Sequence, residues 1–191
     1  MVYIIRKAIE IERLLLLNYH PDLSQGRNHV LALMFDMNPL WEKFVYVSLR
    51  KYLGVTSIIP QQKKPYWKLM GQKPVGLKPD IVVTKDGSFF VIDTKWKVMD
   101  KPKPSEDDLM QMYAYTKYFH SYHTLLCYPG SGKYSSGSFL DEDNFKEKYN
   151  CSISTIKVWA SLPINEWQKK ICESIEQSIQ REKESNFTYS T

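Results

Sequence analysis

The sequence predicts an α/β fold in which helices flank a mixed β-sheet. Three patterns indicate this class: helical periodicity before residue 54, a hairpin pattern around Asp86 and Gly87, and further apolar strands separated by helical segments. Such an alternation of elements favours layers packed around one sheet. We expect a single domain over 1–191, with a mainly helical part over 1–54, a core over 75–160 and a last helix over 165–184.

The first 54 residues are expected to form helices with a break near residues 20–26. The opening segment is apolar in parts, but charged residues interrupt it, so it resembles an amphipathic helix and neither a signal peptide nor a membrane span. In the stretch "MFDMNPLWEKFVYVSLRKYLG", Leu40, Phe44, Val47 and Tyr52 lie near helical spacing. This predicted helix carries Glu42. A basic segment over 60–79 then reads as an irregular loop in which five lysines surround Tyr66 and Trp67.

The stretch "KPDIVVTKDGSFFVIDTKWK" predicts a β-hairpin with Asp86 and Gly87 as its turn. Counting outward from this turn pairs Ile81 with Ile92 and places Asp80 directly opposite Asp93. Lys95 shares the face of Asp93, because side chains alternate along a strand. Like charges directly opposed across a sheet are destabilising, so we expect a divalent cation held by oxygen ligands to offset them.

The rest of the chain supplies two helices and two strands. A helix follows Ser105, which forms a variant capping box with Asp108. The strand "TLLCY" comes next, then a Gly/Ser-rich loop without phosphate-loop spacing, the strand "STIKVWASL", and a last helix capped by Asn165 with Gln168 as its reciprocal partner. The tail from Arg181 is expected to fray.

Composition adds two constraints. The 26 basic and 21 acidic residues give a net charge of +5, which favours a polyanionic partner such as DNA. The three cysteines are odd in number and lack metal-like spacing, so they fit reduced thiols in a cytoplasmic protein. His120 and His123 have a spacing that could suit a metal, but no carboxylate or cysteine completes a ligand set with them, and we expect both to be solvated.

The hairpin residues Pro79, Asp80, Asp93 and Lys95 match the signature of PD-(D/E)xK nucleases. Gln111 and Tyr115 form the Q-x-x-x-Y pair that follows this core in RecB-like members. Together with "FDMNPLWE", "DLMQMYAY" and "LLCYP", these motifs resemble the nuclease domain of McrC, the nuclease subunit of McrBC modification-dependent restriction systems, over about residues 35–160.

This resemblance implies a restriction-endonuclease-like core and a metal-dependent DNA endonuclease that acts against foreign or modified DNA. It implies Mg²⁺, replaceable by Mn²⁺, bound by Asp80, Asp93 and the main-chain carbonyl of Thr94, with Lys95 stabilising the developing negative charge. Glu42 is a further catalytic or metal-binding candidate, or else a surface acid. Gln111 and Tyr115 are expected to orient the substrate phosphate or to brace Lys95, although Tyr115 also suits simple core packing.

Double-stranded DNA is the expected substrate, and lysines near the hairpin are expected to bind its phosphates. The candidates are Lys63, Lys64, Lys68, Lys78 and Lys97. A solvated basic loop is the competing interpretation, which would move the DNA path to Lys97, Lys101 and Lys103.

McrC proteins usually carry an N-terminal domain that engages an McrB-like AAA+ GTPase, and 191 residues leave little room for it. We therefore expect a truncated piece, a short relative or a nuclease of a related system. Two other functions remain open: a stand-alone RecB-like nuclease in DNA repair or end processing, and a non-catalytic DNA-binding or assembly domain. The intact Asp80, Asp93 and Lys95 disfavour the second of these.

Overall fold

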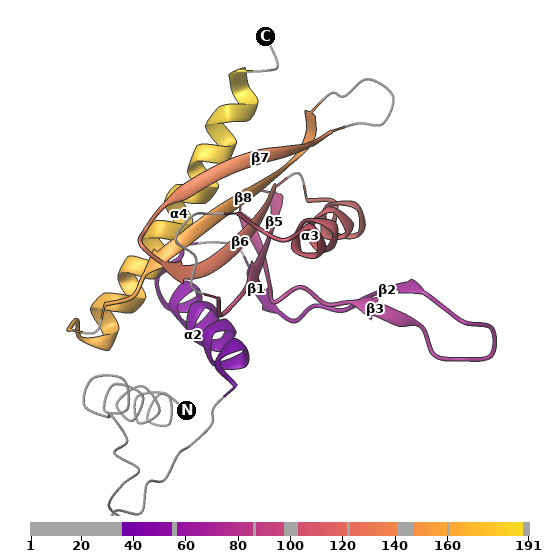
Figure 1. The fold of residues 1–191 in the computed structure, drawn as a ribbon, viewed down its shortest axis with the longest axis horizontal. Helices are drawn as coiled ribbons and strands as arrows, with labels where there is room; N and C mark the ends of the chain where they lie inside the picture. Colours follow the sequence, from indigo (N-terminus) through magenta and orange to yellow (C-terminus); the bar gives the residue numbers. More distant parts are fainter. Residues whose placement is uncertain are drawn as a thin grey trace, which may run out of the picture.

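A six-stranded mixed sheet forms the centre of the fold (Figure 1). The computed structural model describes residues 36–54, 57–85, 87–97, 103–121, 123–140, 147–159 and 161–188. Within them the strand order is β1-β4-β5-β6-β8-β7, in which β5, β6 and β8 run parallel and the other pairs are antiparallel. The strands are β1 (Ser57–Pro60), β4 (Ile81–Lys85), β5 (Ser88–Thr94), β6 (His123–Gly130), β7 (Tyr134–Leu140) and β8 (Glu147–Lys157).

Helices cover both faces of this sheet, which confirms the predicted mixed α/β class (Figure 1). The helices α2 (Met37–Tyr52) and α4 (Ile164–Thr188) pack against each other and share one core cluster with the sheet. The helix α3 (Glu106–Phe119) packs in a second cluster. Neighbouring strand residues divide between them: Ile92 belongs to the α2–α4 cluster and Val91 to the α3 cluster. Alternation along β5 therefore turns Asp93 towards α3.

The buried stripe of α2 shares only Phe44 with the residues placed at helical spacing in the sequence. Its buried side chains are Trp41, Phe44, Val45, Ser48 and Leu49, which recur at the three- and four-residue steps of a helix. Leu40, Val47 and Tyr52, which were placed at the same helical spacing, are only half-buried. The Trp41 side chain is buried in this stripe, and its Nε1 donates to the carbonyl of Cys127 at 3.3 Å. The predicted helix over the opening twenty residues lies outside the described part of the chain.

The hairpin register is confirmed at every described pair. β4 and β5 pair from Lys85 with Ser88 outward to Ile81 with Ile92. Gly87 has φ +75°, a left-handed conformation that glycine adopts without steric cost. Asp80 directly precedes Ile81 and Asp93 directly follows Ile92, so this register agrees with the predicted opposition of the two carboxylates.

The basic segment after β1 is an antiparallel arm and not the irregular loop that was predicted. Strands β2 (Lys64–Trp67) and β3 (Val75–Leu77) pair only with each other among the described residues, with an irregularity between Pro65 and Trp67. The arm projects away from the sheet (Figure 1). Its prolines and glycines concealed the strand pattern in the sequence.

Two further predictions near the C-terminus are wrong. The Gly/Ser-rich segment contributes β7, whose serines bond across to β8: Ser138 Oγ donates to Asn150 Oδ1 at 3.1 Å. The helix α4 begins at Ile164, and the Trp167 N–H donates to the carbonyl of Pro163 at 3.0 Å. Asn165 therefore lies inside the first turn and does not cap it; its Oδ1 accepts from Lys51 Nζ at 3.0 Å.

The last helix also extends further than predicted. Helical backbone continues to Thr188, past Arg181, where fraying was expected. β8 likewise begins earlier than predicted and ends at Lys157, before Val158. Across the described ranges, no helix combines the length and the apolar character needed to cross a membrane.

Candidate functional site

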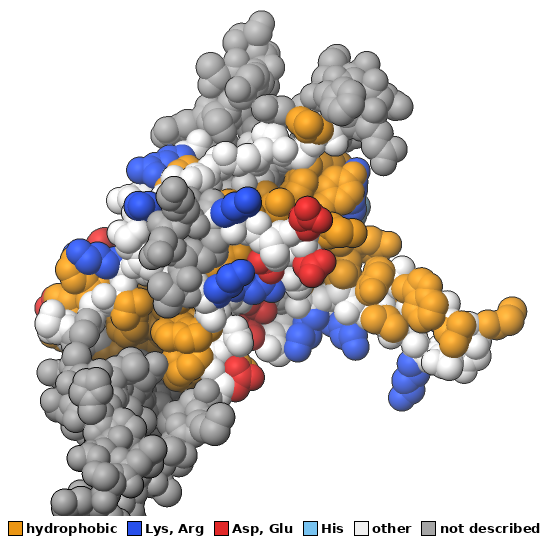
Figure 2. Space-filling view, in the orientation of Figure 1, with side chains coloured by type: hydrophobic (Ala, Val, Ile, Leu, Met, Phe, Trp, Pro, Cys, Tyr) orange, Lys and Arg blue, Asp and Glu red, His pale blue; other side chains and the backbone are white. Residues whose placement is uncertain are grey.

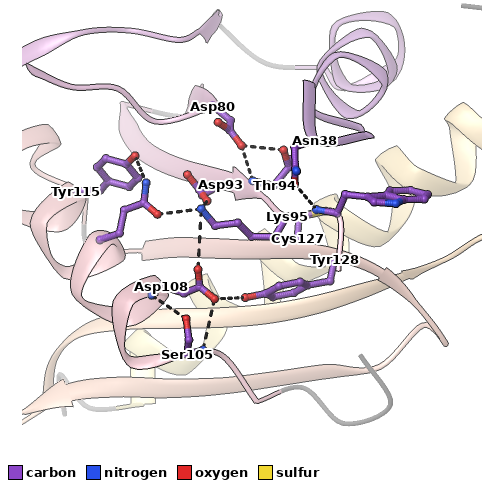
Figure 3. Close-up of polar contacts among 12 residues, drawn as sticks. Asn38, Asp80, Asp93, Thr94, Lys95, Ser105, Asp108, Tyr115, Cys127 and Tyr128 are labelled. Carbon is purple, nitrogen blue, oxygen red and sulfur yellow. Dashed lines mark hydrogen bonds and ion pairs between the residues drawn. The ribbon is translucent and has the colours of Figure 1, made fainter. Parts of the chain in front are cut away.

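The predicted triad of Asp80, Asp93 and Lys95 comes together where β5 ends (Figure 3). Asp93 is the second-last residue of β5 and only 2% exposed. The Lys95 Nζ lies 2.6 Å from Asp93 Oδ2. The Lys95 N–H donates to the carbonyl of Cys127 at 3.0 Å, which keeps the chain beside β6 just beyond the last strand residue. Open α/β sheets commonly bind ligands at this carboxyl end of their parallel strands.

Thr94 holds Asp80 in place through two donors. Its backbone N–H and its hydroxyl both donate to Asp80 Oδ2, at 2.6 and 2.7 Å. These bonds tie the residue before β4 to the last residue of β5, and so fix the two opposed carboxylates relative to each other. The side chain of Thr94 thus has a positioning role that the motif does not indicate.

Lys95 is held from a second direction by α3. Gln111 Oε1 accepts from Lys95 Nζ at 2.9 Å, and Gln111 Nε2 donates to the Tyr115 hydroxyl at 2.7 Å. Of the two roles predicted for this pair, the contacts match the bracing of Lys95. Tyr115 is also buried in the α3 core cluster, so its ring packs in the core while its hydroxyl accepts the hydrogen bond from Gln111. Burial raises the pKa of its hydroxyl, and the charge of Asp93 raises it further.

Asp108 is a site residue whose position the capping box could have revealed. Its Oδ2 accepts from the Tyr128 hydroxyl at 3.1 Å and its Oδ1 lies 4.0 Å from Lys95 Nζ. The reciprocal capping box with Ser105 is present, as predicted. Burial raises the pKa of Asp108, but the bonds from Ser105 and Tyr128 and the charge of Lys95 outweigh it, so the net shift is downward.

Glu42 faces the same region from α2. Gln61 Nε2 donates to Glu42 Oε1 at 2.7 Å, and the Gln61 N–H donates to the carbonyl of Asp80 at 2.8 Å. Burial raises the pKa of Glu42, and the Asp80 charge adds to this while the Gln61 bond opposes it. Gln61 adopts φ +50°, uncommon for a non-glycine residue, and nothing in the sequence marked it.

Asn38 lies one turn before Glu42 on α2 and was also missed. Its Oδ1 accepts a hydrogen bond at 3.1 Å from the backbone N–H of Trp96, the residue that follows Lys95 (Figure 3). Together with the Cys127 carbonyl, this bond fixes the backbone on both sides of the Lys95 side chain. Backbone partners of this kind leave no sequence signature.

Negative charge predominates at the site. The pKa of Asp93 is raised to about 6, first by burial and then by the Asp80 charge, although Lys95 opposes both. Asp93 Oδ2 accepts no well-aligned hydrogen bond from any described residue, so its contact with Lys95 is an ion pair of poor bonding geometry. One ammonium therefore faces several carboxylates, and a further cation would relieve the imbalance.

The donor set fits a hard divalent cation with few protein ligands. Mg²⁺ commonly binds one or two carboxylates and keeps several waters, and Asp80 and Asp93 supply such a pair. Within the described ranges, no three His, Cys, Asp or Glu side chains form a group that could hold a metal by themselves. A dedicated protein cage is therefore absent from that part of the chain, whereas a sparsely liganded cation remains compatible with it.

The predicted phosphate-binding lysines lie in different settings. Lys63, Lys68 and Lys78 are exposed on or beside the arm. Lys64 is engaged, since its Nζ donates to the Tyr118 carbonyl at 2.8 Å and lies 4.8 Å from the centre of the Phe119 ring. Lys97 is exposed, and its N–H donates to the Lys95 carbonyl in a turn beyond the end of β5. Of the lysines on the alternative DNA path, Lys103 is exposed and Lys101 lies outside the described residues.

The histidines and cysteines take no part in this site. His120 is the exposed C-cap of α3 with φ +52°, in agreement with the prediction. His123 is buried and stacks on Phe90 at 5.7 Å, so its predicted exposure to solvent is wrong. Cys127, Cys151 and Cys172 are free and buried, consistent with reduced thiols.

Comparison with known families agrees with the motifs. Residues 2–129 match the family model described as McrBC 5-methylcytosine restriction system component. The chain belongs to this McrBC family. The matched range includes α2, the arm, the hairpin, α3 and most of β6, so Glu42, Asp80, Asp93, Lys95 and Gln111 all lie in the McrBC-family segment.

A solved structure also resembles this McrBC-family chain. It is described as a refined half-complex from the tetradecameric assembly of Thermococcus gammatolerans McrB AAA+ hexamers with bound McrC. The match has a TM-score of 0.55 at 20% identity and covers 76% of this chain and 34% of that one. The likeness therefore concerns the fold, and the chain spans about a third of the length of its match. No curated protein matches the sequence.

Proposed function

We propose that this chain is a metal-dependent DNA endonuclease of the PD-(D/E)xK type, acting as the cleavage component of an McrBC-like restriction system against foreign or modified DNA. The observation that carries the proposal is the convergence of Asp80, Asp93 and Lys95 at the carboxyl end of β5, with Lys95 Nζ 2.6 Å from Asp93. Membership of the McrBC family supports the biological setting.

The residues have distinct roles in this proposal. Asp80 and Asp93 would hold Mg²⁺ or Mn²⁺ together with the main-chain carbonyl of Thr94, and Glu42 would reach the ion directly or through water. A divalent cation there supplies positive charge beside the scissile phosphate and makes a water molecule more acidic. Lys95 orients the attacking water and stabilises the charge that develops on the phosphate oxygens. Gln111 holds the Lys95 ammonium in place, and Tyr115 in turn holds the Gln111 side chain in place.

Lys95 suits this role because its setting maintains a compact cation near the reacting group. Its Nζ contacts Asp93, Gln111 and, at 4.0 Å, Asp108. Three oxygen neighbours restrict the rotamers of a flexible lysine, so little further ordering is needed when a phosphate arrives. The duplex itself would bind through exposed lysines, which contact phosphates without reading bases.

An McrB-like AAA+ GTPase is the proposed partner. The matched solved structure is described as McrB AAA+ hexamers with bound McrC, and the fold likeness extends over most of this chain. The partner would supply the coupling of cleavage to nucleotide hydrolysis, since the described residues show no phosphate-loop motif.

Plasmid cleavage tests the proposal. Methylated and unmethylated plasmids are incubated with Mg²⁺ or EDTA, with and without an McrB-like GTPase subunit and GTP. We expect cleavage only with the metal, and stronger cleavage of methylated DNA with the partner. Metal-independent cleavage would contradict the assigned chemistry, and no cleavage under any of these conditions would contradict the proposal itself.

Two variants separate the roles of the triad. Asp93→Ala should abolish cleavage and weaken Mn²⁺ binding, measured by electron paramagnetic resonance, because it removes a ligand. Lys95→Ala should abolish cleavage but largely retain Mn²⁺. Lys169→Ala on α4, whose side chain is 65% exposed, is the matched control and should behave like the native protein. Full cleavage by either triad variant would refute the assignment.

A further inference from the structure

The β2–β3 arm combines two properties that are not expected of a surface hairpin without a binding role. Residues 61–79 contain five lysines and no acidic residue, although the whole chain has a net charge of only +5. The turn between the strands also exposes large apolar side chains: Met70 is 96% and Leu69 46% exposed. Hydrophobic side chains extend along this arm in Figure 2. Exposed apolar groups within a basic surface mark an interaction site.

The base of the arm is attached to α3, whereas the side chains of Leu69 and Met70 at its tip are exposed. Lys64 Nζ bonds to the Tyr118 carbonyl at 2.8 Å, and the rings of Tyr66 and Tyr118 meet edge to face at 6.1 Å. The stem of Lys63 crosses Gly76, where a Cβ would lie 2.6 Å from its Cε. A braced base with an exposed tip presents its end to a partner in a defined direction.

The arm is also joined to the candidate site at both ends. Gln61, just before it, bonds to the Asp80 backbone and to Glu42, and Lys78 and Pro79, just after it, lead directly into Asp80. The chain from Gln61 to Met70 spans about 20–30 Å at the rise of a twisted strand. At about 3.4 Å per base pair, the tip can contact DNA roughly six to nine base pairs from the site.

We infer that the arm is a duplex-binding element that lies along DNA bound at the candidate site, with Leu69 and Met70 entering the minor groove and partly unstacking the bases there. This inference rests on the proposed nuclease function. The charge of the arm selects DNA over a protein partner, because its lysines complement a polyanion and residues 61–79 contain no acidic side chain. Leu and Met are among the apolar wedges that minor-groove proteins insert between base steps.

The test uses the full chain in EDTA, where no metal-dependent cleavage can occur. The variant Leu69→Gln/Met70→Gln removes the apolar tip and keeps every lysine. Leu140→Gln on β7 is the control, since Leu140 is likewise 55% exposed but lies outside the arm. Affinity is measured on random duplexes of increasing length, and base unstacking by the fluorescence of 2-aminopurine placed at successive positions.

We expect the native protein to gain affinity as duplexes lengthen beyond about ten base pairs and to raise 2-aminopurine fluorescence. The tip variant should lose both effects, with affinity for long duplexes roughly tenfold lower, and should keep the native dependence on salt. Leu140→Gln should match the native protein. Unchanged affinity and fluorescence in the tip variant would overturn the inference. So would loss of binding to an McrB-like subunit with unchanged DNA binding, which would identify the tip as a protein contact.

The two proposals can fail separately. A protein that shows the length dependence and the unstacking signal in EDTA, yet never cleaves with metal, would contradict the nuclease function and leave the arm as a DNA-binding element. A protein that cleaves with metal but shows neither arm signal would contradict the arm inference alone.

Discussion

Asp93 is buried next to Asp80 and Asp108, so the metal-free fold carries an electrostatic cost at this one side chain. Its pKa is raised to about 6, mainly by burial, against about 4 in an unfolded chain. The folded state therefore binds the proton more tightly than the unfolded state does. The free energy of unfolding is fully maintained below about pH 4 and falls as the pH rises towards 6.

Asp93→Asn should stabilise the metal-free protein at pH 7–8 by about 1–3 kcal/mol, because the amide removes the buried charge. It should also remove the fall in stability between about pH 4 and pH 6. Urea unfolding in EDTA across this pH range measures both effects. Added Mg²⁺ should stabilise the native protein and not the variant.

The control for this prediction is Glu173→Gln, because the Glu173 side chain is 51% exposed and forms only a 4.0 Å surface pair with Lys169. We expect it to change stability by less than about 0.5 kcal/mol at any pH. If Asp93→Asn destabilises the metal-free protein at pH 8, the assigned burial cost is wrong.

Gln111 and Tyr115 can be ranked by their distance from the reacting group. Gln111→Ala removes an acceptor of Lys95 Nζ and should lower kcat for cleavage roughly ten- to hundredfold, with KM for DNA nearly unchanged. Tyr115→Phe breaks only the outer bond to Gln111 and should cost less than tenfold. Single-turnover cleavage with Mg²⁺ measures the effect, and a larger loss for Tyr115→Phe would reverse the proposed order of support.

Among single residues, the sequence predicted those whose positions follow from the pairing of one hairpin. Asp80, Asp93 and Lys95 follow from hairpin register alone, because a two-residue turn fixes every pair outward from it. Gln61 and Asn38 could not be predicted in the same way. Each has a backbone partner distant in sequence, and the residue type of that partner does not affect the bond. The side-chain bond from Gln61 to Glu42 also joins residues that only the fold brings together.

Among the secondary-structure elements, the arm provides the test of DNA binding. Lys63, Lys68 and Lys73 are exposed, whereas Lys64 is bonded to α3. Each phosphate contact contributes about −0.9 to the log–log slope of affinity against salt on duplex DNA. Replacing the three exposed lysines with alanine should flatten this slope by roughly two to three units and weaken all sequences alike. A salt series on a random duplex provides the measurement.

Lys64→Ala is the informative comparison within the arm. It should change the slope little, and it should loosen the base of the arm because the bond to the Tyr118 carbonyl is lost. An unchanged slope in the triple variant would move the DNA path away from the arm, towards Lys97 and Lys103.

The sequence predicted the elements that have strong local signals, such as a helix cap, a hairpin turn or an apolar run. It did not predict the arm strands or β7, whose own residues carry no such signal. α3 follows from its capping box, and β6 from its apolar run. The arm strands and β7 are rich in Pro, Gly or Ser, which read as loops when considered alone. They become strands because a neighbour satisfies their backbone groups, as β8 does for β7.

For the whole molecule, the contact between α2 and α4 is a core feature that the sequence did not predict. Ile171 and Ile175 of α4 are fully buried in the same cluster as Phe44 and Leu49 of α2. Ile171→Ala should lower the free energy of unfolding by about 2–5 kcal/mol, since it opens a cavity in this shared core. Urea unfolding with Lys169→Ala as the surface control measures it. A loss below about 1 kcal/mol would mean that α4 contributes little to the core.

The order of synthesis on the ribosome gives this α2–α4 contact a further consequence. The last residue of α2 is Tyr52 and the first of α4 is Ile164, so the two halves of the shared core are separated by most of the chain. At about 5–20 residues per second, α2 waits roughly 6–22 s before its partner is made. During that interval Trp41 and Phe44 lack their helical cover, whereas the hairpin with Asp80 and Asp93 can already pair. We therefore expect chaperones to bind, and misfolding to begin, while the nascent chain has not yet reached Ile164.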